Sequence, residues 1–191
     1  MRGQAHTLEA FTAAVLVVGG LIFATQATAV TPLSASTSNQ HIENQQEATV
    51  EGLLAAAEEN GSLAEAARYD GPEGESVEGA RDEEPYASAP PNAFGTALTE
   101  TLSSRRIAFN VEVRYRTVEG GTDVEPMVRM GEPSDNAVVA TRTVGVYNSS
   151  RLTGPDDRRL GDLDAEEFYA PNLDDSELYN LLEVEVTVWR K

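Results

Sequence analysis

Side chains that could do catalytic or metal chemistry are few and scattered in this 191-residue chain. Its two histidines, His6 and His41, form no HExxH or other metal-binding pair, and there is no cysteine. Nucleophile-elbow, P-loop and dinucleotide-binding patterns are absent from the sequence. The acidic residues near the C-terminus do not follow the alternating pattern of a calcium loop: Asp156, Asp157, Asp162, Asp164, Asp174 and Asp175. We therefore predict a non-catalytic protein without a metal or cofactor.

The N-terminus has the most informative spacing of residue types. It reads MRGQAHTLEAFTAAVLVVGGLIFATQATAV, in which Glu9 directly precedes an uncharged run over 10–30. An ionisable group inside hydrocarbon costs a few kcal/mol, so it is usually paired or functional there. The alternative for Glu9 is a position at a headgroup interface, where the carboxylate costs little.

The residue types before this run resemble archaeal prepilin-type signals, with Arg2, Gly3, Gln4, Thr7 and Glu9 supplying the match. More narrowly, QAHTLEAF and the terminal LEVEVTVWRK resemble haloarchaeal pilin-like membrane proteins of unknown function. The family pattern places Ser two residues and Glu four residues after Gln, whereas Thr7 is three and Glu9 five residues after Gln4. Three alternatives stay open: cleavage before Gln4, cleavage after Gln4, or no cleavage.

The resemblance implies a role for these residues in processing and assembly. A prepilin-type peptidase would remove the first three or four residues, and Glu9 would neutralise the new terminal ammonium of a neighbouring subunit while apolar helices bundle. The rival feature is Ala27-Thr28-Ala29, which has the form of a leader-peptidase site and would remove the helix altogether.

The charge balance restricts the class of partner. Acidic residues number 32 against 14 basic ones, which gives a formal charge of −18. This excess argues against nucleic acid and anionic lipid surfaces as ligands, because both need Lys or Arg patches. Lys191 is the single lysine, and all other basic residues are arginine. Self-repulsion at this charge requires screening by salt, which predicts a halophilic, archaeal protein; a mesophilic acidic surface protein is the alternative.

The uncharged run favours a transmembrane helix over 8–30, since 23 residues make about 34 Å of helix. Arg2 precedes the run and the next basic residue is Arg68, so the positive-inside rule places the N-terminus in the cytoplasm. We expect a single-pass protein of the cell membrane, in contact with the lipid bilayer, with an extracellular head.

Hydrophobic periodicity predicts an α+β head with an antiparallel sheet. An apolar stripe predicts a stem helix over about 38–59 that ends at Asn60-Gly61 and covers the apolar face of the sheet. A short helix over 93–104 follows Asn92 as its N-cap. Period-two alternation predicts strands over 107–118, 124–130, 137–148 and 183–190, with Pro126 confining the second to a sheet edge. Because no βαβ rhythm occurs, the sheet should be antiparallel.

These assignments divide the chain into five segments: a cytoplasmic leader (1–7), the transmembrane helix (8–30), a stem helix region (31–69), an acidic Gly/Pro-rich linker (70–92) and the extracellular α+β head (93–191). Asn60 and Asn148 begin N-glycosylation sequons on the predicted outer side.

The predicted function is a pilin-like or pseudopilin-like structural subunit of an archaeal cell-surface filament or secretion-type assembly. Its expected partners are like subunits, a membrane assembly platform and a prepilin-type peptidase. The alternative is a single-pass anchored extracellular binding or scaffold domain that does not polymerise.

Overall fold

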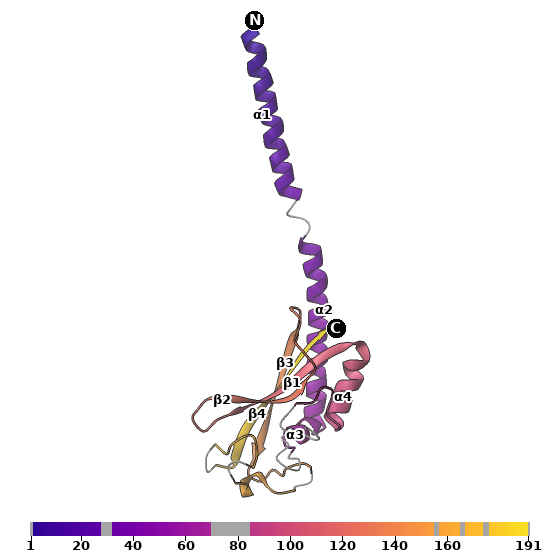
Figure 1. Cartoon of the computed structure of the whole chain (residues 1–191), viewed down its shortest axis with the longest axis vertical. Helices are drawn as coiled ribbons and strands as arrows, with labels where there is room; N and C mark the ends of the chain where they lie inside the picture. Colours follow the sequence, from indigo (N-terminus) through magenta and orange to yellow (C-terminus); the bar gives the residue numbers. More distant parts are fainter. Residues whose placement is uncertain are drawn as a thin grey trace. The chain divides into compact units, whose positions relative to one another are not determined.

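The computed structural model describes residues 2–27, 32–69, 85–154, 157–164, 167–173 and 176–190 (Figure 1). The chain forms two compact units, Met1–Ile42 and Glu43–Lys191. Most of the predicted linker, residues 70–84, lies outside the described residues.

The first unit is helical. It contains α1 (Arg2–Ala27) and the beginning of α2 (Pro32–Glu59). In the described part of the chain, no helix has both the length and the apolar character needed to cross a membrane. The predicted transmembrane helix over 8–30 is therefore wrong, and so is the single-pass location with an extracellular head that was built on it.

The distribution of polar residues along α1 gives a physical reason for this correction. In the described residues α1 runs from Arg2 to Ala27, and Thr12 and Thr25 flank its longest stretch without a polar side chain, 13–24. Those residues make about 18 Å of helix, whereas the hydrocarbon core of a bilayer is about 30 Å thick. Apolar stretches of this length more often pack inside protein.

The helix α2 begins at Pro32, earlier than predicted, which fits the preference for proline in the first turn. It ends where predicted, because the backbone turns at Gly61 with φ 83°, a left-handed conformation that glycine adopts without strain. The short helix α3 (Ser62–Ala67) follows directly. The predicted apolar stripe is confirmed by burial of Gln46, Val50, Leu53, Leu54 and Ala57.

The second unit is an α+β fold around one antiparallel sheet. The strands are β1 (Ile107–Arg116), β2 (Thr122–Arg129), β3 (Val138–Tyr147) and β4 (Leu178–Arg190), in the order β2-β1-β4-β3. The remaining helical elements are α4 (Ala93–Thr101), η2 (Ser103–Arg105) and η3 (Leu160–Asp162). The Asn92 side chain accepts a hydrogen bond from the Gly95 N–H and caps α4, as predicted. Figure 1 shows α2, α3 and α4 grouped on one side of the sheet.

Cross-strand register aligns the apolar side chains of the three longest strands on the face toward the helices. Val111 of β1 pairs with Val186 of β4, which pairs with Ala140 of β3, and all three are buried. The core also takes in Leu54 of α2 and Phe94 of α4, neither of which has any exposed surface. The opposite face carries polar side chains such as Glu112 and Arg114 of β1 and Glu185 of β4, together with some apolar ones.

The last strand, β4, is longer than predicted. β4 begins at Leu178 instead of about 183 because its first residues pair with the end of β3, Leu178 with Tyr147 and Asn180 with Val146. The buried Asn180 side chain also connects β4 to β1. Its Oδ1 accepts from the N–H groups of Arg116 (3.1 Å) and Leu181 (2.8 Å), and its Nδ2 donates to the carbonyls of Arg116 (3.0 Å) and Pro171 (2.8 Å). One side chain therefore extends the contact between β1 and β4 by a residue.

Candidate functional site

The surface of α1 is the most apolar exposed surface in the described part of the chain. Its exposed large side chains lie all around the helix, at fractional exposures of 54% to 74%: Phe11, Val15, Leu16, Val17, Val18, Leu21 and Ile22. They come from consecutive positions as well as from helical repeats, because the sequence between Ala10 and Ala24 has almost no polar residue. An exposed apolar surface of this extent indicates an interaction site rather than a surface that faces only water.

One side of α1 carries a shallow groove of about 380 Å³, lined by Ala14, Val15, Val18, Gly19 and Ile22. The spacing 15, 19 and 22, with 14 and 18 beside it, follows the i, i+3 and i+4 neighbours of one helix face. A Cβ placed on Gly19 would meet no atom within 4 Å, so the glycine leaves space that another helix can enter.

The residues predicted for processing and assembly lie in the first turns of α1. The backbone at Gly3, Gln4 and Thr7 is helical, but the surroundings of these side chains lie outside what the structure describes. Glu9 is exposed near the beginning of the apolar stretch. Their predicted role therefore stays a prediction.

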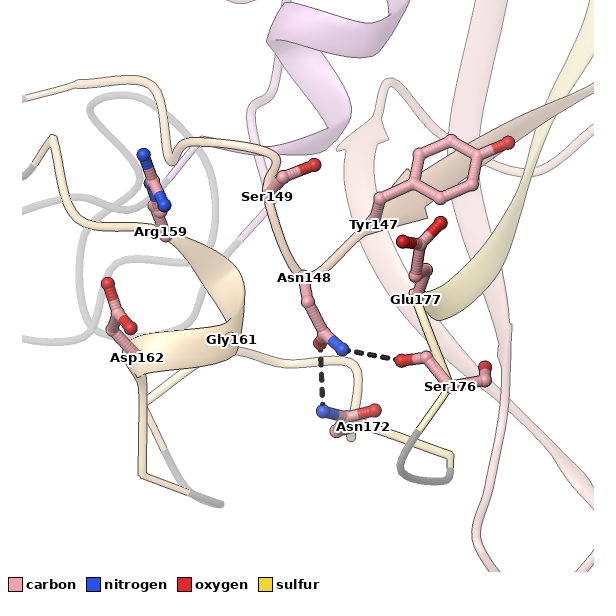
Figure 2. A pocket seen from close by; sticks show the side chains of 9 residues that line it. All are labelled: Tyr147, Asn148, Ser149, Arg159, Gly161, Asp162, Asn172, Ser176 and Glu177. Atoms are coloured by element: carbon pink, nitrogen blue, oxygen red, sulfur yellow. Dashed lines mark hydrogen bonds between the residues drawn. The ribbon is translucent and has the colours of Figure 1, made fainter.

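The second unit has an open polar pocket of about 640 Å³ where β3 ends and β4 begins (Figure 2). Asn148 is at its centre: its Nδ2 donates to the Ser176 carbonyl at 2.6 Å, and its Oδ1 accepts from Asn172 Nδ2 at 3.0 Å. A Cβ on Gly161 would lie 2.9 Å from the Asn148 Cβ, so only glycine lets η3 approach this closely. Three exposed charged residues complete the lining: Arg159, Asp162 and Glu177.

The described lining of the pocket offers hydrogen-bonding groups and contains no histidine. The two serine hydroxyls of this lining, on Ser149 and Ser176, therefore have no described histidine there to act as a base. Within the described residues, no group of three or more His, Cys, Asp or Glu side chains could hold a metal ion. His41 lies on α2, is exposed and is not among the described lining residues.

The two predicted glycosylation sequons differ in geometry. Asn60 is exposed at the end of α2, where its Oδ1 accepts from the Ser62 N–H at 2.9 Å. The Nδ2 of Asn148, the atom to which a glycan would attach, is already hydrogen-bonded to Ser176. Glycosylation of Asn148 would therefore disrupt the pocket, whereas a glycan on the Nδ2 of Asn60 would leave the hydrogen bond from the Ser62 N–H to the Asn60 Oδ1 intact. Glycosylation of Asn60 and of Asn148 remains a prediction.

The sheet face away from the helices carries a cross-strand ion pair. The Arg114 guanidinium donates two hydrogen bonds to the Glu185 carboxylate, at 3.1 and 3.2 Å, and lies 3.8 Å from Glu112. Hydrogen bonding to Glu185, with the negative charge of that residue, raises the pKa of Arg114 above its usual value. Because the pair is partly exposed, its contribution to stability is small.

Sequence reasoning missed the pocket and the role of Asn180. The pocket residues come from separate turns, and no short motif joins Asn148, Arg159 and Asn172. Asn180 stands in SELYNLL, where an amide has no periodic signal that distinguishes a buried bridge from a solvent contact. For Asn148, the sequence pattern that stood out was the glycosylation sequon. That pattern predicts attachment of a glycan and not a hydrogen-bonding role in a pocket.

No curated protein and no solved structure matches this chain. A family model, described as "Family of unknown function (DUF7288)", matches residues 2–188. Because the match covers nearly the whole chain, the protein belongs to this family of unknown function, DUF7288.

Proposed function

We propose that this protein is a non-catalytic, pilin-like structural subunit whose α1 helix packs against the α1 helices of other copies. The observation that carries the proposal is the apolar surface of α1, exposed on all sides of the helix. Burying a Val, Leu, Ile or Phe side chain stabilises the state in which it is buried by about 1.5–3 kcal/mol. Several such side chains of α1 would be buried in a helical bundle.

The arrangement of small residues supports a helix as the occupant of the α1 groove. Ala14 and Gly19 lie beside Val15, Val18 and Ile22, so a second helix can approach closely and fill the space between the branched side chains. A neighbour with the same sequence offers the same alternation of small and large side chains. The apolar length of α1 also suits a helix buried within protein.

The test measures assembly of the full chain and of Val15→Ser/Val18→Ser, which keeps the helix but removes apolar surface from the groove. We expect the wild-type chain to sediment as multimers and the variant to dissociate with an unchanged head. The control is Val118→Ser, since Val118 in the head is 67% exposed, comparable to Val17 at 62%. A wild-type chain that stays monomeric at all concentrations, or a variant that assembles normally, would refute the proposal.

The N-terminal motif suggests how assembly is regulated. We propose that a prepilin-type peptidase removes the residues before Gln4 or Ala5 and that Glu9 then pairs with the terminal ammonium of a neighbour. Mass spectrometry of the mature protein should find one of these two starts, and Glu9→Ala should reduce assembly. A start at Met1 or Arg2 would contradict processing alone, whereas a start at Val30 would remove α1 and with it the whole proposal.

The charge balance supports a halophilic, archaeal setting for this assembly, because a formal charge of −18 repels itself in dilute buffer. The melting temperature of the full chain should rise between dilute buffer and molar KCl, where the Debye length falls to about 3 Å. Equal melting temperatures at both salt concentrations would contradict the halophilic setting and leave the role of α1 untouched.

A further inference from the structure

The sheet of the second unit has two edge strands, and they differ in how they are protected from pairing with another chain. β2 has the features that block strand addition: Pro126 lacks an N–H, and the pairing with β1 is irregular between Val111 and Glu112. Part of its outer edge is also covered, because Tyr86 accepts from Arg129 N–H (2.8 Å) and donates its N–H to the Met127 carbonyl (3.0 Å). This edge is closed to a partner.

β3 lacks these protections. It runs for ten residues without proline, and its pairing with β4 is regular from Val138 to Val146. Among the described residues, only β4 forms backbone hydrogen bonds with 138–146, so the other side of the strand presents unpaired N–H and C=O groups. Such an edge is a template for another strand.

The charges of β3 favour a second copy of the same strand. The segment 137–148 contains no acidic residue, although the whole chain has 32. Its one charged side chain, Arg142, points to the helix side, where its Nε lies 3.2 Å from a Glu58 carboxylate oxygen. Two β3 edges can therefore approach each other without the acidic repulsion that most of this chain would impose.

We propose that β3 pairs antiparallel with β3 of a second copy, in a register centred on Thr143. This register places Thr143 opposite Thr143 and Arg142 opposite Val144 instead of opposite another Arg142. It also places Val139 opposite Tyr147, the two side chains of β3 that are large, apolar and about half exposed (48% and 49%). Aromatic–β-branched and Thr–Thr pairs are favourable across antiparallel strands. The two sheets become one continuous sheet of eight strands.

This contact is a second interface, distinct from the α1 packing of the proposed function. It joins copies through their heads, so an assembly held by α1 would gain a lateral or longitudinal connection. Because β3 and its partner strand belong to the second unit, the pairing needs no contribution from α1.

The natural chain has no cysteine, which makes disulfide trapping a direct test of the register. Directly opposed residues in an antiparallel pair lie about 4.5–5.5 Å apart at Cα, within the range for a disulfide. The full chain with Thr143→Cys should give a covalent dimer on mild oxidation. Thr141→Cys should not, since it faces Gly145 of the partner, and neither should Thr122→Cys on the closed edge β2.

Repeating the trapping in the Val15→Ser/Val18→Ser background separates this inference from the proposed function. We expect the Thr143→Cys dimer to form there, while a Leu16→Cys dimer through α1 is lost. Trapping at Leu16→Cys in the unmodified background but not at Thr143→Cys would overturn the β3 pairing and leave the α1 proposal standing. Equal trapping at Thr143→Cys and Thr122→Cys would mean random collision and would also overturn it.

A charge variant tests the same contact without cysteine. Thr143→Asp places like charges opposite each other at the centre of the seam and should weaken head-to-head association several-fold, with Thr122→Asp as the matched control on β2. Both sites are exposed, so both variants should keep the fold. Unchanged association of Thr143→Asp in the Val15→Ser/Val18→Ser background would contradict the proposal.

Discussion

The two long helices of this protein carry their apolar residues differently. On α2 they form one stripe, and Val50, Leu54 and Ala57 of that stripe are buried within the same chain. On α1 they occupy every side of the helix, and Leu16 remains 74% exposed. A single stripe needs one neighbouring surface, which the sheet provides, whereas a helix apolar on all sides needs neighbours on all sides.

The difference separates two kinds of stability in one molecule. The stripe of α2 contributes to the free energy of unfolding of the head. The surface of α1 contributes to the free energy of association, which depends on protein concentration. Substitutions of one residue type on the two helices should therefore change two different measurements.

The largest expected effect comes from a matched pair of leucine truncations. Leu54→Ala should lower the free energy of unfolding of the head by about 2–5 kcal/mol, because it leaves a cavity in the core. Leu16→Ala should leave that free energy unchanged and weaken association. Chemical denaturation of each variant, with sedimentation at several concentrations, measures both quantities. If Leu16→Ala destabilised the head as much as Leu54→Ala, the distinction between the helices would fail.

Asn180 tests whether the head depends on its own buried hydrogen bonds. Asn180→Ala removes the partners of the Arg116 and Pro171 backbone groups and should cost about 2–3 kcal/mol of unfolding free energy. Asn172→Ala is the control, since it removes one exposed hydrogen bond to Asn148 and should cost much less. Similar losses in both variants would show that burial of Asn180 has no special importance for β4.

Much of the head could be predicted from the sequence, and the reason is periodicity. Alternation marked β1 and β3 to within two residues, and the helical stripe marked the buried face of α2. The start of β4 could not be predicted this way, because it depends on pairing with the distant end of β3, where Leu178 lies opposite Tyr147. For α1, hydropathy indicated an apolar helix but not what surrounds it, and the assignment to a bilayer was the step that failed.

A smaller, stabilising effect should come from the single polar member of the α2 stripe. The Gln46 side chain is 6% exposed, and its Nε2 has no hydrogen-bond partner among the residues that the structure describes. Gln46→Met keeps the shape and removes an unsatisfied donor, so the free energy of unfolding should rise by about 1 kcal/mol. The same substitution at the exposed neighbour Gln45 should have almost no effect. A destabilised Gln46→Met variant would mean that the Gln46 amide makes a hydrogen bond that stabilises the head. Apolar contacts alone would then not account for the burial of the α2 stripe.

A last, pH-dependent effect concerns the contact between α3 and the segment before β4. The Tyr169 hydroxyl donates to the Ala67 carbonyl, and its ring contacts Phe168 and Tyr115. Burial of this hydroxyl, with smaller contributions from the negative charge of Glu125 and from Tyr115, raises the pKa of Tyr169 well above 10. The unfolded chain loses this proton near pH 10, so the stabilising contribution is complete below that pH and declines as pH rises toward the folded pKa.

Tyr169→Phe should therefore act in opposite directions at the two ends of the pH range. At pH 7 it loses one hydrogen bond, about 1 kcal/mol of unfolding free energy. Above pH 10 the wild-type chain loses stability by up to about 1.4 kcal/mol per pH unit through this one group, and the variant does not, so the difference shrinks and then reverses. Urea denaturation between pH 7 and 11 measures it, with Tyr147→Phe, at a half-exposed position, as the control. If the difference in unfolding free energy between the wild-type chain and Tyr169→Phe stayed constant across that range, the Tyr169 hydroxyl would be accessible to water. The contact with α3 would then be less well packed than the core beneath α2.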